Sequence, residues 1–344
     1  MTGKWSLPSE ALVLGLETSC DETAAAVVRP DGTVVASVVA SQDELHAPFG
    51  GVVPEIASRR HTEIITAVVQ EALDRAGIGA GELALIGVTQ GPGLIGSLVV
   101  GAAAAKAYAL AWDLPLVGVN HVQAHMMAAF LHEPGKPAPA QWVFPTLCLI
   151  VSGGHTDLML LSGPGEYELL GCTRDDAAGE ALDKVARLLG LGFPGGPALE
   201  AAAREGDPHA VPLPLPQLPP YEFSFAGLKS ALAREVEGRG ELTAQEVADF
   251  AASFQRAVVA TLLHTVRAAV AEFAPRQLLL GGGVAANQSL REGFARLGGD
   301  DLVVAIPPRE YCTDNAAMIA LSAALKYEKD GPDEMDFDVY SAMP

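Results

Sequence analysis

Two patterns of hydrophobic and polar positions alternate along the chain. Short apolar runs bounded by Gly, Pro, Asn or Asp predict strands, and longer stretches with apolar residues three and four apart predict helices. In the first half we predict strands at 13–18, 24–28, 34–41, 84–89 and 116–119, and helices at 54–76, 94–112 and from 120 onward. In the second half we predict strands at 146–151, 157–161, 277–280 and 302–306, and helices at 177–189, 197–204, 245–273, 287–297 and from 313 onward.

The same order of elements occurs once in each half: strand, glycine turn, helix, strand, helix. The glycine turns are 91–93 and 281–283. Strands that alternate with helices predict an α/β protein with mainly parallel sheets covered on both faces. Two such lobes would place their ligand loops at the carboxyl ends of the strands, so we expect the site in the cleft between the lobes.

The length of 344 residues fits two domains. We assign 1–130 to a first lobe, which the C-terminal segment 325–344 joins, and 131–324 to a second lobe. Six prolines between Pro208 and Pro220 predict a surface insertion at 206–222, because proline interrupts helices and central strands.

Composition narrows the function classes. The chain is 49% hydrophobic and 19% charged, as packed globular proteins are. A net charge of −20 disfavours a stand-alone nucleic-acid binder, although a local basic strip or a partner can supply the attraction to RNA. The four cysteines form no C-x-x-C pair, and the first ten residues contain no apolar signal core, so we predict a cytoplasmic protein with reduced thiols. For the uncharged stretch 87–105 we predict a strand, a turn and a buried helix rather than a membrane span.

The segment 91–96 matches the dinucleotide pattern G-x-G-x-x-G, but the match is weak. That motif needs an acidic residue at the end of the next strand, and Asn120 and His121 stand there instead. We therefore interpret these glycines as a tight turn with close helix–strand packing.

His121 and His125 are four residues apart at the start of a predicted helix, so they share one face and can share a metal ion. At the equivalent place in the second half stands Asp314. Two imidazoles and one carboxylate suit zinc or ferrous iron. A zinc protease would need Glu directly after the first histidine, where this chain has Val122.

Several loops offer contacts to a nucleotide. The turn 152–154 fits a phosphate-binding backbone and an ordinary hairpin about equally well. Asp183, one turn into a helix, could hold ribose hydroxyls, and the glycines before Asn287 expose backbone at a helix N-terminus, where anions bind. Asp21 lies in a polar, acidic turn and could face a phosphate through a metal or water.

Seven separated motifs, in this order, resemble those of the universal tRNA threonylcarbamoyladenosine transferase family, called TsaD in bacteria and once described as an O-sialoglycoprotein endopeptidase. The resemblance covers about residues 11–327. The motifs are GLETSCDET at 15–23, Asn120-His121 with His125, VSGGHT at 151–156, DDAAGEALDK at 175–184, FSFAGLK at 223–229, GGGVAAN at 281–287 and Thr313-Asp314-Asn315.

This resemblance implies a duplicated actin-like ATPase fold, shared with sugar kinases and Hsp70 and abbreviated ASKHA. It implies transfer of a threonylcarbamoyl group from threonylcarbamoyl-AMP to N6 of the adenosine 3′ to the anticodon, in tRNAs that read codons beginning with A. The metal ligands would be His121, His125 and Asp314, with Asp21 as a further catalytic acid. Residues that would bind the nucleotide are Ile150, Val151, Ser152, Gly153, Gly154, Asp183, Gly196, Glu200 and Asn287.

The family resemblance also implies cofactors and partners. One divalent metal is expected, iron(II) by family with zinc as the alternative, together with an adenine nucleotide, threonylcarbamoyl-AMP or ATP. Relatives outside bacteria place a Tyr ligand where this chain has Ile150, so substrate or water would take that position. The bacterial partners are the degenerate paralogue TsaB, which pairs through the first lobe, the P-loop ATPase TsaE, and a separate synthase that supplies the donor.

Alternatives remain open. A sugar or acetate kinase on the same fold would have no use for the histidine pair, whereas a metal-dependent O-carbamoyltransferase acting on a small molecule would share most of the site. A catalytically silent scaffold subunit would have no reason to keep three metal ligands. Five basic residues are either phosphate contacts for tRNA or solvated surface groups: Arg59, Arg60, Lys184, Arg187 and Lys229.

Overall fold

A computed structural model describes residues 5–136, 140–163, 165–216 and 218–342 of the chain. The chain forms two compact units. The first unit contains Met1–Gln141 and Thr313–Pro344, and the second contains Trp142–Cys312. The first unit thus extends to Gln141, where the sequence predicted a boundary at 130. The chain returns to it at Thr313, about one helix earlier than the predicted residue 325.

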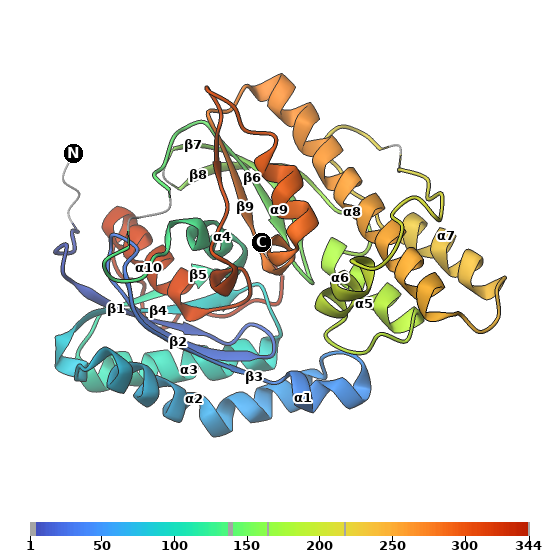
Figure 1. The fold of residues 1–344 in the computed structure, drawn as a ribbon. Coiled ribbons are helices and arrows are strands. Elements are labelled where there is room, and N and C mark those ends of the chain that lie inside the picture. The colour runs from blue at the N-terminus through green and yellow to red at the C-terminus, as the bar shows by residue number, and fades with distance from the viewer. Residues whose placement is uncertain (1–4, 137–139, 164, 217, 343–344) are drawn as a thin grey trace. The chain divides into compact units, whose positions relative to one another are not determined.

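The first unit is built on a five-stranded mixed sheet with the order β3-β2-β1-β4-β5. β1 pairs antiparallel with β2, and β2 with β3, whereas β1–β4 and β4–β5 are parallel. The strands are β1 (Leu12–Glu17), β2 (Glu22–Val28), β3 (Val34–Ser41), β4 (Leu83–Gly91) and β5 (Leu116–Asn120) (Figure 1).

The second unit repeats this topology strand for strand, with the order β10-β9-β6-β7-β8. Its strands are β6 (Thr146–Val151), β7 (Thr156–Gly163), β8 (Glu166–Cys172), β9 (Gln277–Gly281) and β10 (Val303–Ala305). The duplication predicted from the sequence is therefore confirmed. The prediction of mainly parallel sheets is wrong, because short connections join the first three strands of each sheet as hairpins, and only the strands reached over a helix run parallel.

Helices cover both faces of the first sheet. α2 (Pro54–Ala76) and α3 (Ile95–Trp112) pack together against one face, and α10 (Ala316–Asp330) packs against the other (Figure 1). Leu14 and Leu16 of β1 join the core on the α2–α3 side, and Gly15 between them faces α10, since successive strand residues point to opposite faces. A Cβ atom on Gly15 would lie 2.1 Å from the carbonyl oxygen of Ala316, so the glycine allows α10 its close approach. Two shorter helices, α1 (Asp43–His46) and α4 (His121–Met127), complete this unit.

α3 is long and apolar enough to cross a membrane by length and composition, and one third of its 18-residue window is buried. Core helices of ordinary globular domains pass the same test, and here α3 packs on β4 and α2. The sequence predicted a buried helix, but only one face of α3 is covered: Ile95, Val99 and Leu110 are exposed, Leu110 at 72%.

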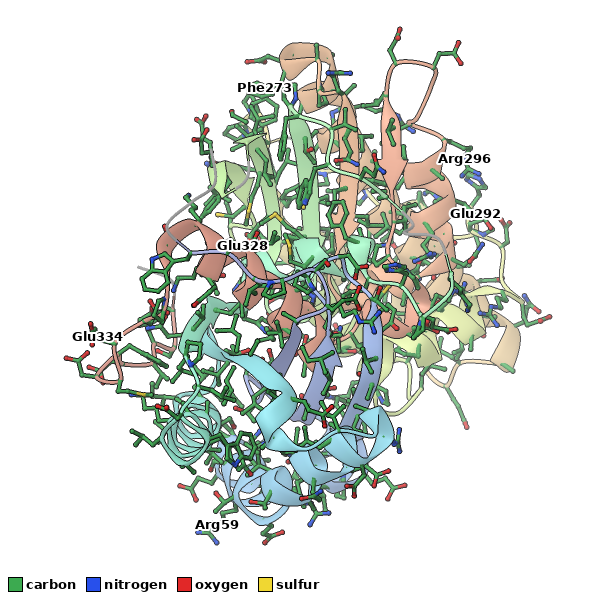
Figure 2. All side chains as sticks on the ribbon, turned by 90° about the vertical axis from the view of Figure 1, so that its left-hand side faces the viewer. Arg59, Phe273, Glu292, Arg296, Glu328 and Glu334 are labelled. Carbon is green, nitrogen blue, oxygen red and sulfur yellow. The ribbon has the colours of Figure 1, made fainter. Side chains whose placement is uncertain are left out.

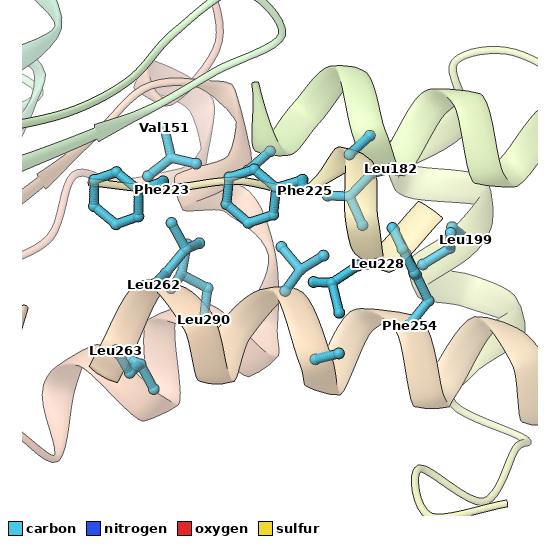
Figure 3. Packing of buried hydrophobic residues seen from close by; sticks show 14 of the residues in the cluster. Val151, Leu182, Leu199, Phe223, Phe225, Leu228, Phe254, Leu262, Leu263 and Leu290 are labelled. Atoms are coloured by element: carbon cyan, nitrogen blue, oxygen red, sulfur yellow. The ribbon is translucent and has the colours of Figure 1, made fainter. Parts of the chain in front are cut away.

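The core of the second unit lies between its sheet and a layer of helices. Leu147, Leu149 and Val151, alternate residues of β6, contribute the sheet side. Figure 3 shows Phe223 and Phe225 packed with leucines from several helices, among them Leu262 of α8 and Leu290 of α9. The helices are α5 (Ala178–Leu188), α6 (Gly195–Ala203), α7 (Ala226–Glu237), α8 (Ala244–Phe273) and α9 (Gln288–Ala295).

The Pro-rich segment contains no regular helix or strand among its described residues, as predicted, but it is not purely a surface insertion. Val211 and Leu213 are buried in the core of the second unit, and the Val211 amide donates to Ser253 Oγ at 3.1 Å. Residue 217 of this predicted insertion lies outside the described residues.

Many charged side chains lie at the surface. Figure 2 shows Arg59 and Glu334 in the first unit, and Glu292 and Arg296 in the second, directed away from the ribbon. The sequence did not predict the exposed edge strand β8, the helix α7 or the four-residue helix α1. β8 carries no buried face that would give a regular alternation, and all of its residues are at least partly exposed.

Candidate functional site

Three neighbouring parallel strands of the first sheet end in polar side chains. Glu17 is the last residue of β1, Thr89 lies near the end of β4, and His121 follows β5 directly. Asn120 caps the helix that begins there, since its side-chain oxygen accepts from the Gln123 amide at 3.0 Å. This cap starts α4 so that His121 and His125 lie on one helix face.

The third residue near the two histidines is Asp314, which stands just before α10. Asn315 caps this helix by accepting from the Met318 amide at 3.0 Å, so the helix begins at Ala316 rather than at residue 313 as predicted. Asp314 Oδ1 lies 3.5 Å from His121 Nε2 and 3.2 Å from His125 Nε2. The three potential ligand atoms lie within 4.8 Å of one another. Asp314 therefore belongs to the same unit as the histidines, and its assignment to the second lobe is corrected, because the apolar face of α10 packs on the first sheet.

The donor set fits a divalent metal. Both histidines are buried, with exposed fractions of 7% for His121 and 1% for His125. Neither ring nitrogen of His125 has a hydrogen-bond partner in the described part of the chain, although Nε2 is close to Asp314. A buried polar group left unpaired costs about 1–3 kcal/mol, whereas metal coordination would satisfy the Nε2 lone pair. Two imidazole nitrogens and one carboxylate oxygen suit zinc or iron(II).

The electrostatics of this region are dominated by buried carboxylates. Burial alone would favour neutral His121, but Asp314 and Glu17 raise the pKa of His121 to about 9. Burial also opposes the charged form of Glu17, yet the interaction with His121 lowers the pKa of Glu17 below its ordinary value. Burial, together with Asp314 and Asp21, raises the pKa of Glu22 well above its ordinary value. Asp21, the predicted catalytic acid, is buried in the turn between β1 and β2 within this acidic group.

In the second unit, the predicted loop 150–154 is the end of β6 and the hairpin turn to β7. Ser152 Oγ accepts from the amides of Gly154 at 3.3 Å and His155 at 3.0 Å. Ile150 and Val151 are buried, whereas Gly153 and Gly154 are exposed. A Cβ atom on either glycine would meet nothing within 4 Å. The hairpin interpretation is confirmed, and the backbone of the turn is open enough for a ligand to approach.

The remaining predicted nucleotide residues make four hydrogen bonds in the second unit. Asp183 Oδ1 accepts from the Gly196 amide at 2.8 Å, and Glu200 Oε1 accepts from the Gln288 amide at 3.0 Å. Asn287 caps α9 by accepting from the Leu290 amide at 3.1 Å, and its side-chain nitrogen donates to Gln255 Oε1 at 2.8 Å. These contacts fix the side chains of Asp183, Glu200 and Asn287.

Three of the five basic residues proposed as phosphate contacts are engaged in ion pairs. Lys184 Nζ lies 2.7 Å from Asp176, and Lys229 also donates to Asp176, so both lysines are engaged in ion pairs. Arg60 pairs with Glu63 at 3.0 Å, and Arg59 and Arg187 are exposed. The turn 91–93 is tight, as predicted: a Cβ atom on Gly93 would lie 2.6 Å from the Ser19 carbonyl oxygen.

Glu17 is the residue that the sequence analysis missed. Its Oε2 lies 3.0 Å from His121 Nδ1 and accepts from Thr89 Oγ1 at 2.6 Å. The available signal was a carboxylate at the end of an otherwise apolar, buried strand, since such residues are almost never fully buried without partners.

Two sheets of identical mixed topology, with a polar cluster at the carboxyl ends of strands, define a duplicated actin-like α/β fold. The solved component A of (R)-2-hydroxyglutaryl-CoA dehydratase from Acidaminococcus fermentans shares it, with a TM-score of 0.53 at 14% identity over 93% of this chain and 100% of that one. The model of the tRNA N6-adenosine threonylcarbamoyltransferase family, TsaD, matches residues 33–321. The chain belongs to this family.

Relatives with that name cover nearly the whole chain. The tRNA N6-adenosine threonylcarbamoyltransferase of Symbiobacterium thermophilum is 56% identical over 315 residues, which are 91% of this chain and 90% of the relative. The one from Thermomicrobium roseum is 47% identical over 354 residues, 97% and 96% of the two chains. This chain is therefore an acyltransferase that modifies tRNA.

Proposed function

We propose that this chain transfers the threonylcarbamoyl group from threonylcarbamoyl-AMP to N6 of the adenosine 3′ to the anticodon, and that His121, His125 and Asp314 hold a metal ion for this reaction. The observation that carries the proposal is the convergence of both Nε2 atoms on Asp314 Oδ1, at 3.5 and 3.2 Å. The buried nitrogens of His125 have no hydrogen-bond partner among the described residues, which supports the proposal further.

The three ligands would hold one divalent cation. Iron(II) is the expected ion by family, and zinc fits the same donors. When bound, the ion supplies Lewis-acid stabilisation of negative charge on a substrate oxygen. The donor is an activated mixed anhydride with AMP as leaving group, so no covalent enzyme nucleophile is needed.

Asp21 is the proposed acceptor of the proton that N6 loses, with a carboxylate of the substrate as the alternative. Asp21 is buried beside Glu22, and burial together with Asp314 and Asp21 raises the pKa of Glu22 well above its ordinary value.

We assign the nucleotide to the second unit. The open backbone of Gly153 and Gly154 suits a phosphate, and Asp183, fixed by the Gly196 amide, suits the ribose hydroxyls. The fixed side chains of Glu200 and Asn287 would border the same ligand, beside the end of β6 that Ile150 and Val151 form.

Partners would compensate for the net charge of −20, which repels tRNA. We assign the partner roles to TsaB, TsaE and a separate threonylcarbamoyl-AMP synthase, as the family resemblance implies. Arg59 and Arg187 are the better candidates for phosphate contacts, because Lys184 and Lys229 are already paired with Asp176.

The test combines the purified chain, the partner proteins, labelled threonylcarbamoyl-AMP and anticodon-stem-loop RNA, followed by mass analysis of nucleosides. We expect threonylcarbamoyladenosine next to the anticodon, and a loss of about 100-fold or more in Asp314→Ala, since a Lewis-acid contribution is worth several kcal/mol. Asp330→Ala, at the exposed far end of the same helix, is the matched control and should keep full activity.

One result would favour the rival function. If RNA stays unmodified and AMP is released only when a small hydroxylated acceptor is supplied, the chain is a small-molecule O-carbamoyltransferase.

A further inference from the structure

Glu17 is a fully buried carboxylate with three polar partners. Its exposed fraction is 0%. The Ser19 amide donates to Oε1, and Thr89 Oγ1 donates to Oε2 at 2.6 Å. The third partner is His121 Nδ1, which lies 3.0 Å from Oε2. These three partners come from the β1–β2 turn, from β4 and from the start of α4, so the carboxylate is held from three sides.

This arrangement decides which nitrogen of His121 carries the proton. Both oxygens of Glu17 act as acceptors, Oε1 from the Ser19 amide and Oε2 from Thr89 Oγ1, so the nitrogen that faces Oε2 is the one that donates. The other neighbour of Nδ1, Ser19 Oγ at 3.3 Å, can donate or accept and imposes no choice. With the proton on Nδ1, the Nε2 lone pair points to the side of the ring on which Asp314 lies.

The two histidines differ in this respect. Neither ring nitrogen of His125 has a hydrogen-bond partner among the residues that the structure describes. Carboxylate support is therefore found at His121 and not at His125. A carboxylate behind a ligating imidazole fixes the ring orientation and raises the basicity of the ligand.

We propose that Glu17 is a positioning residue that holds His121 in the Nδ1–H form and presents Nε2 to the metal. This inference rests on the proposed metal site and goes beyond it, since Glu17 acts through His121 without touching the metal. It also assigns a reason for the carboxylate at the end of β1, where an apolar residue would otherwise fit the buried strand.

The test is calorimetric titration of the metal-free full-length chain with Zn²⁺. We expect Glu17→Gln to weaken zinc binding about 10- to 100-fold, the usual effect of removing such a partner. An amide in this place either turns its NH₂ group to Nδ1 and favours the wrong tautomer, or turns it to the Ser19 amide, where two donors face each other. Ser19→Ala is the matched control, because it removes the other neighbour of Nδ1 and leaves the carboxylate, and it should stay within about threefold.

A double-mutant cycle separates positioning from a general structural role. If Glu17 acts through His121, Glu17→Gln should have little further effect on zinc binding in a His121→Ala chain. An equal weakening in both backgrounds would contradict the proposal, as would unchanged zinc binding in Glu17→Gln alone. Absence of zinc binding in the wild-type chain would instead overturn the metal site itself, and this inference with it.

A second measurement needs no variant and therefore does not depend on the folding of Glu17→Gln. In the zinc-loaded wild-type chain, ¹H–¹⁵N spectra of the histidine rings should show His121 with a proton on Nδ1 and zinc on Nε2. Zinc bound through Nδ1 would overturn the proposal.

Discussion

At the scale of single residues, buried carboxylates in this protein fall into two kinds. Glu17 is surrounded by donors and keeps its charge. Asp157 of β7 is different, because burial alone raises the pKa of its carboxyl group from the ordinary value of 3.8 to about 6. The first kind serves a neighbouring histidine, and the second costs stability at neutral pH.

Asp157→Asn should therefore stabilise the protein more at neutral pH than in acid. Because the folded-state pKa of Asp157 lies above the unfolded value, the native state holds an extra proton between about pH 4 and pH 6. The destabilisation therefore grows as the pH rises through that window and is complete above it. We expect a gain of about 1–2 kcal/mol at pH 7.5, reduced from about 3 kcal/mol for a fully buried group because Asp157 is partly exposed. Urea unfolding at pH 7.5 and at pH 4.5 measures the gain in the free energy of unfolding at each pH. An equal gain at the two pH values would contradict this account.

At the scale of elements, α10 links packing to the candidate metal site. Its helix axis can approach β1 and β4 because Gly15 and Gly87 have no side chains, and Asp314 stands just before its first turn. The glycine of the first motif is thus required for packing, although the motif as a whole belongs to the functional region.

Gly15→Ala should displace α10. The new Cβ atom would lie 2.1 Å from the Ala316 carbonyl oxygen, and overpacking of this kind costs about 1–3 kcal/mol. We expect the melting temperature to fall by about 3–10 °C and zinc binding to weaken, since Asp314 moves with the helix. Gly81→Ala is the control, because a Cβ atom there meets nothing within 4 Å. Equal melting temperatures for the two variants would show that α10 does not depend on this contact.

α8, the 30-residue helix of the second unit, begins with a capping box. Thr243 Oγ1 accepts from the Glu246 amide at 3.2 Å, and Glu246 Oε2 accepts from the Thr243 amide at 2.9 Å. Thr243→Ala should lower the free energy of unfolding by about 1 kcal/mol, whereas Glu246→Gln, which keeps the capping geometry, should cost much less. Chemical unfolding of both variants gives the comparison, and a larger loss in Glu246→Gln would refute the importance of the threonine cap.

At the scale of the whole molecule, the two units differ in chain continuity. The second unit is one continuous segment, Trp142–Cys312, whereas the first needs both ends of the chain. α10 buries eight of its residues, from Ala316 to Ala324, in the first unit. The chain must therefore reach its last thirty or so residues before the first sheet is covered on both faces.

A chain that ends at Cys312 should consequently lose the first unit and keep the second. Without α10, one face of the first sheet is exposed to water, which costs about 25 cal/mol for each Å² of apolar surface. We expect limited proteolysis to digest residues before 141 and to leave a stable fragment of 142–312. Resistance of the first segment to protease in the truncated chain would contradict this dependence.

Much of this protein could be predicted from its sequence. The strands and long helices follow from local hydrophobic periodicity, and the duplication follows from the repeated order of those elements. The histidine pair and Asp314 could be proposed as ligands, since residue types and spacing carry that signal, and the structure brings them together. The family resemblance adds the reaction, which the comparison with relatives supports.

Tertiary structure alone decided the rest. Local periodicity says which face of a strand is buried but not which strand pairs with it, so periodicity cannot distinguish mixed sheets from mainly parallel ones. It cannot show that α10 crosses back to the first sheet, nor that Val211 and Leu213 are buried in a proline-rich segment. The role of Glu17 depends on the packing of β1, β4 and β5 side by side. The hydrogen bonds that define this role join residues about 70 and 100 positions apart. Contacts of that range arise from packing of the whole unit, and no short window of sequence contains them.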